Sequence, residues 1–181
     1  MRKLNTIIVL IIMILIIDHI IFGSMHFLGT GASVIKPLAM IMFLLVLIHA
    51  LISMIITIRA EKVGFKTKAR YNKENRQFWL RRASGMAIVI LAFIHAYSMV
   101  KNEKGIPNIT RMPKALRFST PLLILSVGIH LLGNIRPLLI SLGIRKLDRY
   151  EKITKVLVIL ITLFAMVANI IYIINMIKRG R

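Results

Sequence analysis

Long apolar runs alternate with short basic stretches along this chain of 181 residues. Five apolar runs occupy residues 4–28, 37–58, 83–100, 118–142 and 153–177. A helix rises about 1.5 Å per residue, so each run can cross a hydrocarbon core of about 30 Å, the third only with its flanks. The pattern predicts an all-α membrane protein with five transmembrane helices in a single domain, residues 1–181, the first four helices forming the functional bundle.

The basic residues predict how the helices cross the membrane. With a cytoplasmic N-terminus, 17 of the 26 Lys and Arg residues fall on the cytoplasmic side, as the positive-inside rule favours. Arg2 and Lys3 open the chain as in a signal peptide, but the apolar run behind them exceeds the roughly 7–15 residues of a signal-peptide core, so we expect a retained helix. The expected location is the cytoplasmic membrane of the cell.

The formal net charge of +20 raises the question of a nucleic-acid partner. The basic residues flank apolar spans and are not gathered in a soluble module, so we expect anionic lipid or an acidic partner protein and no nucleic acid. The longest basic stretch, residues 59–82, contains Trp79, which suits an interfacial anchor. This stretch could dock a soluble subunit on the cytoplasmic face or simply contact lipid.

The candidate chemistry lies inside the spans, because four of the five histidines occupy different apolar runs: His19, His49, His95 and His130. An imidazole in a bilayer is costly unless it is hydrogen-bonded or bound to a cofactor. Structural hydrogen bonding explains one such residue well, but one on each of four consecutive helices favours axial ligation of haem iron. The chain has no cysteine, which excludes thioether-linked haem and cysteine-ligated iron–sulfur clusters in this chain. We therefore predict two non-covalent b haems.

The depth of each histidine predicts how the four could pair. His49 and His130 each lie 13 residues after a cation, Lys36 and Arg117, or about 20 Å from the outer edge by helical rise. His95 lies six residues before Lys101 and His19 ten before Gly29, which places both nearer the outer face. Depth thus pairs His49 with His130 and His19 with His95. Depth leaves open whether His26 takes the place of His19 as the ligand, because His26 lies seven residues later on nearly the same helix face.

Other polar groups in or near the spans suggest supporting roles. Guanidinium groups bind carboxylates through paired hydrogen bonds, so Arg81, Arg82 and Arg136 are candidates for the propionates of one haem, with topological snorkelling as the alternative. Asp18 is the one carboxylate inside an apolar run, so we expect it to be protonated, paired or facing water. It could handle protons near a quinone or form a structural hydrogen bond with Asn169 or a serine.

The residues around the histidines resemble the cytochrome b subunits of the succinate:quinone oxidoreductases, in the five-helix, two-haem class that includes quinol:fumarate reductases. The similar positions are His19 with Ser24 and Gly29, the segment His49-Ala50, Trp79 with Ser84-Gly85 and His95-Ala96-Tyr97, and His130 with Gly133 and Arg136. The resemblance covers residues 4–142, and for the last apolar run, residues 153–177, it is only a general one. The serine and glycine spacing selects His19 over His26.

The resemblance implies bis-histidine ligation of a distal haem by His19 and His95 and of a proximal haem by His49 and His130. It also implies a flavoprotein subunit and an iron–sulfur subunit on the cytoplasmic face. The chain would pass electrons between the iron–sulfur subunit and menaquinone or another quinone, and would hold no dicarboxylate site itself. No quinone-binding residue is carried over, because no acid stands between Asp18 and Glu61, a region where some members use one.

Two other functions compete with this one. A di-haem cytochrome b can serve another membrane dehydrogenase, such as a hydrogenase or a formate dehydrogenase. A small transporter can relay protons through buried histidines, but it is expected to carry more intramembrane acids and helix-breaking prolines than Asp18 and Pro137 supply.

Overall fold

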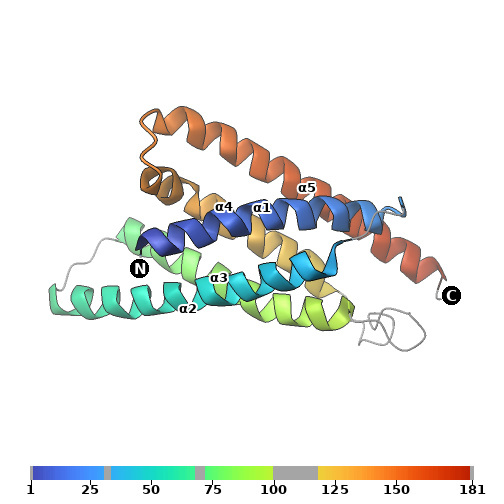
Figure 1. The fold of residues 1–181 in the computed structure, drawn as a ribbon, viewed down its shortest axis with the longest axis horizontal. Coiled ribbons are helices and arrows are strands. Elements are labelled where there is room, and N and C mark those ends of the chain that lie inside the picture. The colour runs from blue at the N-terminus through green and yellow to red at the C-terminus, as the bar shows by residue number, and fades with distance from the viewer. Residues whose placement is uncertain (1, 31–33, 68–71, 100–117, 180–181) are drawn as a thin grey trace.

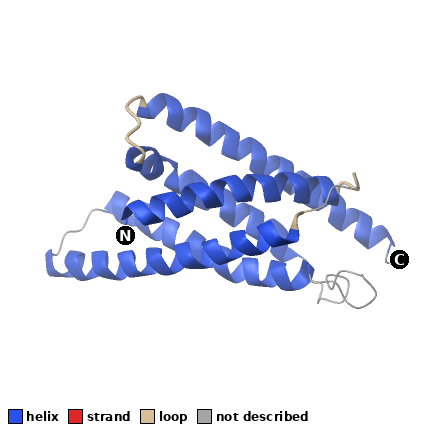
Figure 2. Ribbon diagram, viewed as in Figure 1, coloured by secondary structure: helices blue, strands red, loops and turns tan. Residues whose placement is uncertain are grey.

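The computed structural model is a bundle of five helices and describes residues 2–30, 34–67, 72–99 and 118–179, without the side chains of residues 2, 60–67, 72–75 and 179. The helices are α1 (Arg2–Phe27), α2 (Lys36–Thr67), α3 (Asn72–Met99), α4 (Ser119–Ser141) and α5 (Leu147–Arg179). The described residues contain no strand (Figure 2). All five helices are long and apolar enough to cross a membrane, which confirms the predicted multi-pass, all-helical class. The two termini lie at opposite ends of the bundle (Figure 1).

Three helices extend beyond the apolar runs that predicted them. The stretch between the second and third runs is largely helical, because α2 continues to Thr67 and α3 begins at Asn72. The third span therefore gains the flank that it needed, and the apolar part of α3 is Arg76–Met99. Helix α5 begins at Leu147, six residues before its apolar run. Apolar length locates a span but not the polar turns that continue the same helix into water.

Ion pairs accompany the early start of α5. The Arg136 guanidinium of α4 lies 2.9 Å from a Glu151 carboxylate oxygen and 3.6 Å from one of Asp148. Lys155, one turn beyond Glu151, approaches the other Glu151 oxygen to 2.6 Å. Asp148 also stands in the first turn of α5, where the helix dipole favours a negative charge. These contacts hold the polar first turns of α5 against the end of α4.

The hairpin of α4 and α5 forms the best-packed part of the bundle. Ile135, Leu139 and Val158 are buried together between the two helices. The turn is closed by Gly143, whose φ of +72° lies in the left-handed region, and Ile144 returns a hydrogen bond to the carbonyl of Leu139 at 3.2 Å. This short connection fixes α4 and α5 as antiparallel neighbours.

Burial is uneven around the bundle. The most extensive helix contacts join α3 to α4 and α4 to α5, and α1 packs against α2 and α5. Of the described side chains in the span Lys36–Arg59 of α2, none is buried, whereas α5 buries Val158, Ala165, Ala168, Asn169 and Ile173. The closely packed apolar core therefore lies on the α4–α5 side, and the side formed by α1, α2 and α3 carries mainly half-buried side chains.

We predict that Gly128→Ala destabilises the hairpin by about 1–3 kcal/mol, the usual range for overpacking. A Cβ at residue 128 would lie 2.9 Å from Cγ2 and 3.0 Å from Oγ1 of Thr162. That side chain is branched at Cβ, and its hydroxyl donates to the carbonyl of Val158 at 2.7 Å, so it cannot turn aside cheaply. The measurement is the free energy of unfolding in detergent micelles.

The control for this prediction is the double variant Gly128→Ala/Thr162→Ala. It leaves only the Thr162 Cβ contact, at 3.5 Å, which is an ordinary van der Waals distance. We expect the double variant to recover most of the loss, which a double-mutant cycle measures directly. Equal destabilisation by Gly128→Ala in the two backgrounds would show that this contact does not set the α4–α5 spacing.

Candidate cofactor site

The structure brings the four intramembrane histidines together as two pairs. The ring centroids of His19 and His95 are 6.1 Å apart, and those of His49 and His130 are 6.4 Å apart. These are the pairs that helical rise predicted, although two of the cations used as depth marks, Lys101 and Arg117, lie outside the described residues.

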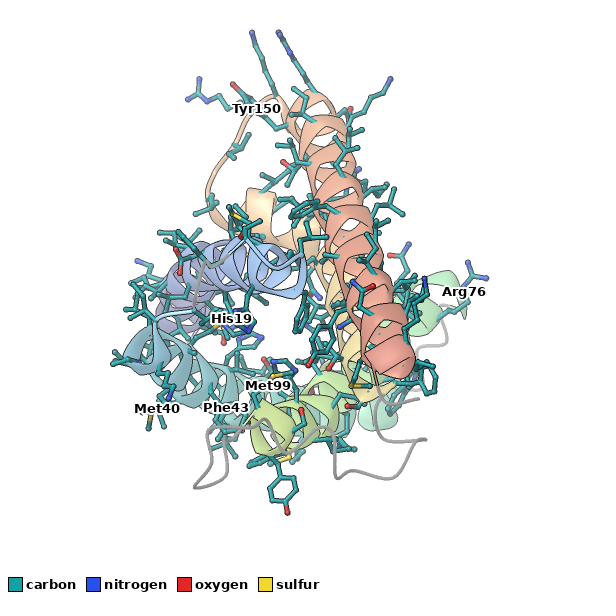
Figure 3. The ribbon with its side chains drawn as sticks, turned by 90° about the vertical axis from the view of Figure 1, so that its right-hand side faces the viewer. His19, Met40, Phe43, Arg76, Met99 and Tyr150 are labelled. Atoms are coloured by element: carbon teal, nitrogen blue, oxygen red, sulfur yellow. The ribbon has the colours of Figure 1, made fainter. Side chains whose placement is uncertain are left out.

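The interior position of the His19 ring is clear from the view along the bundle (Figure 3). In Figure 3 the His19 side chain lies inside the ring of helices, whereas Met40 of α2 lies on its outside. The side chains of all four paired histidines are half-buried, but His26 is exposed near the end of α1. Of the two histidines of α1, only His19 therefore faces another histidine.

Each pair joins two helices that are not close neighbours. His19 lies on α1 and His95 on α3, whereas His49 lies on α2 and His130 on α4. The main contacts of α1 are with α2 and α5, and those of α4 are with α3 and α5. The two pairs lie at different levels, since Ser84 beside His130 and Thr120 beside His95 place them about 15 Å apart by helical rise. The arrangement offers two stacked positions, each with one imidazole on either side.

The separation of the rings discriminates between two kinds of contact. A direct N–H···N hydrogen bond of about 2.9 Å, with about 1.1 Å from each nitrogen to its ring centre, sets the centroids about 5 Å apart. Two imidazoles on opposite sides of one metal atom, each with a metal–nitrogen bond of about 2 Å, have centroids about 6 Å apart. The distances of 6.1 and 6.4 Å exceed that of a direct hydrogen bond; they leave room for the second arrangement and are also those of an edge-to-face ring contact.

The outward-facing nitrogen of His130 is held by Ser84 of α3. Ser84 Oγ lies 3.1 Å from Nδ1 of His130 and also 2.8 and 3.2 Å from the carbonyls of Leu80 and Arg81. The single hydroxyl proton serves those carbonyls, so toward the ring the oxygen accepts a hydrogen bond from Nδ1–H. The lone pair of His130 is therefore on Nε2. At the next position, a Cβ on Gly85 would lie 3.2 Å from His130 Cε1, so this glycine permits the ring to approach α3.

Two further Nδ1 contacts come from residues that sequence reasoning did not single out. Asn5 Oδ1 of α1 lies 2.9 Å from Nδ1 of His49, and Thr120 Oγ1 of α4 lies 3.3 Å from Nδ1 of His95. Nδ1 of His19 is buried without a hydrogen-bond partner in the described residues. The sequence does show that Asn5 and Thr120 are polar residues near the ends of apolar runs. It does not show how the helices are rotated, and this rotation decides which histidine ring each residue contacts.

The three candidate arginines fall into two groups. Arg82 donates through Nε to Thr57 Oγ1 and lies 4.5 Å above the ring of Phe78, and its charge interacts with both His49 and His130. Arg81 also interacts electrostatically with His130, whereas Arg136 pairs with the carboxylates of α5. Arg81 and Arg82 therefore flank one histidine pair, and their role toward a propionate stays a prediction.

A structural hydrogen bond with Asn169 or a serine was one of the alternatives for Asp18, and the Asn169 side-chain oxygen takes no part in such a bond within the described residues. Asn169 is only 2% exposed, but its Oδ1 has no hydrogen-bond partner in the described part of the chain. Asp18 itself is half-buried and interacts electrostatically with His19. The two side chains lie on different helices, and apolar length does not fix their relative rotation.

The donor set fits a haem better than a metal ion held by protein ligands alone. The described residues contain no group of three or more His, Cys, Asp or Glu side chains placed to hold a metal ion. A haem supplies four equatorial nitrogens to its iron, so the protein needs to supply only two axial ligands. Two opposed imidazoles at each of two levels meet this requirement.

No protein-family model, curated protein or solved structure matches the chain.

Proposed function

We propose that the chain is the membrane-anchor cytochrome b subunit of a succinate:quinone oxidoreductase, either a succinate dehydrogenase or a fumarate reductase. The observation that carries the proposal is the pairing of His19 with His95 and of His49 with His130 at centroid distances of 6.1 and 6.4 Å. Each pair would hold one b haem by bis-histidine ligation. The described residues thus offer two cofactor positions in a bundle whose five helices can each cross a membrane.

The haems would supply one-electron redox chemistry, and the chain's own residues would provide ligation, orientation and charge. His130 presents Nε2 because Ser84 accepts from its Nδ1–H, and Gly85 allows the ring to sit close to α3. Arg81 and Arg82 place positive charge beside the His49–His130 pair, where the carboxylates of a haem could be neutralised. Two levels about 15 Å apart by helical rise would carry electrons across much of the membrane.

The proposed partners follow from the same site. The chain offers a path for electrons but no cysteine for an iron–sulfur cluster, so a separate iron–sulfur subunit and a flavoprotein subunit would complete the complex on the cytoplasmic face. A quinone in the membrane would exchange electrons with the haems. The proposed contact region for the soluble subunits includes exposed Trp79 and the neighbouring ends of α2 and α3.

Haem content of histidine variants tests the pairing. We expect two b haems per wild-type chain by the pyridine haemochrome assay, and one after His130→Ala. The double variant His49→Ala/His130→Ala should also retain one, because both residues serve the same haem. In contrast, His19→Ala/His130→Ala should retain none.

His26→Ala is the matched control for these variants and should keep both haems, because His26 is exposed and outside the two pairs. Retention of a haem by His19→Ala/His130→Ala would contradict the pairing. A wild-type protein that binds no haem, when expressed with adequate haem supply, would overturn the proposed function.

The partners are tested by purification from native membranes. We expect the chain to co-purify with a flavoprotein carrying covalent flavin and with a cysteine-rich iron–sulfur protein, and we expect succinate to reduce haem in that complex. Malonate, a competitive analogue of succinate, should block the reduction. Co-purification of a hydrogenase or formate dehydrogenase with no reduction by succinate would instead assign the chain to another dehydrogenase.

Charge beside the histidines gives a further prediction. Arg82→Gln should lower the reduction potential of one haem, because a nearby positive charge favours the reduced iron. Arg136→Gln is the matched control, since Arg136 is paired with Glu151 and Asp148 on α5. The measurement is a spectroscopic redox titration of both variants, and an equal effect of the two substitutions would show that Arg82 has no special proximity to a haem.

A further inference from the structure

Asn5 is a polar residue in the second turn of α1, at the opposite end of that helix from His26. Its side-chain oxygen lies 2.9 Å from Nδ1 of His49, a residue of α2 that is 44 positions away in the chain. Both side chains are half-buried between the two helices. The contact is the shortest that a polar side chain makes with any of the four paired rings among the described residues.

The chemistry of this contact fixes the protonation of the ring. An amide oxygen has no proton and only accepts, so the contact is a hydrogen bond when Nδ1 of His49 carries the hydrogen. A neutral ring protonated at Nδ1 has its lone pair on Nε2. The same hydrogen bond makes Nε2 a stronger electron donor, as carboxylates and carbonyls do for metal-bound histidines in general.

The four rings differ in the partner of Nδ1, and this difference distinguishes the His49–His130 pair from the His19–His95 pair. In the His49–His130 pair both Nδ1 atoms meet an accepting oxygen, from Asn5 and from Ser84. In the other pair the contact from Thr120 is longer, at 3.3 Å, and Nδ1 of His19 has no partner in the described residues. An effect of Asn5 is therefore confined to one level of the bundle.

We propose that Asn5 is a positioning residue that fixes the ligating tautomer of His49 and lowers the reduction potential of the haem held by His49 and His130. The inference rests on the proposed function, because it acts through a haem at that pair. A stronger acceptor at Nδ1 increases electron donation from Nε2 and stabilises the oxidised iron. Loss of the acceptor has the opposite effect.

The test is a spectroscopic redox titration of the purified complex with two variants at residue 5. Asn5→Asp keeps the oxygen and gives it a negative charge, so one haem potential should shift to a more negative value. Asn5→Ala removes the acceptor, so the same potential should shift to a more positive value. The second haem should keep the wild-type potential in both variants, because His19 and His95 do not contact Asn5.

Two control variants separate positioning from other effects. Leu4→Asp places a carboxylate on the neighbouring position, where the side chain is 55% exposed, and should shift the potential much less than Asn5→Asp. Ser98→Ala removes a hydroxyl that donates to the backbone carbonyl of His95 and not to its ring, so it should leave both potentials unchanged. These controls test whether the direct contact with a ring nitrogen is what matters.

The outcomes distinguish this inference from the proposed function. A wild-type protein without two b haems would overturn the proposed function and the inference with it. Two haems in the wild type, with potentials that Asn5→Asp and Asn5→Ala leave unchanged or shift in the same direction, would overturn the inference alone. Asn5→Asp is nearly isosteric with the native residue, so it provides the decisive comparison if Asn5→Ala fails to assemble.

Discussion

The constraint on which this bundle depends is that an imidazole has two ring nitrogens, and both need a partner inside an apolar environment. In three of the four paired rings, a side chain from another helix meets Nδ1. The second nitrogen cannot be served by the opposing ring, because centroid distances of 6.1 and 6.4 Å exceed that of a direct hydrogen bond. In the proposed function, a haem iron between the rings would satisfy the second nitrogen.

This requirement agrees with the uneven packing of the helices. Helices α4 and α5 approach closely through Gly128, and their apolar side chains are buried. Helices that carry paired histidines, α1 with α3 and α2 with α4, are not the main neighbours of one another. The proposed haem between two imidazoles would need such a separation, because its ligands would approach from opposite faces. Close packing on one side of the bundle and half-buried side chains on the other are two parts of one arrangement.

The sequence predicted the number of spans and the pairing of the histidines well, since both depend on distance along a helix axis. Apolar length gives the span, and residue spacing gives depth. Contacts around the axis were not predictable in the same way. Asn5 contacts His49, and Arg136 contacts Glu151, because of how each helix is rotated about its axis. A helix with apolar residues on all sides has no polar face from which this rotation could be predicted. The early start of α5, which interhelical ion pairs accompany, was likewise not predictable from apolar length.

Identical ligand types do not make the two levels chemically equivalent. The His49–His130 pair has an accepting oxygen at each Nδ1 and two arginines nearby, whereas the His19–His95 pair has one longer contact and the carboxylate of Asp18 beside it. With haem iron at the first pair, as proposed, hydrogen bonding and charge would act in opposite directions, since acceptors at Nδ1 favour oxidised iron and guanidinium groups favour reduced iron. The balance at that level would therefore respond to Asn5, which can be altered without changing a proposed ligand or a charged residue.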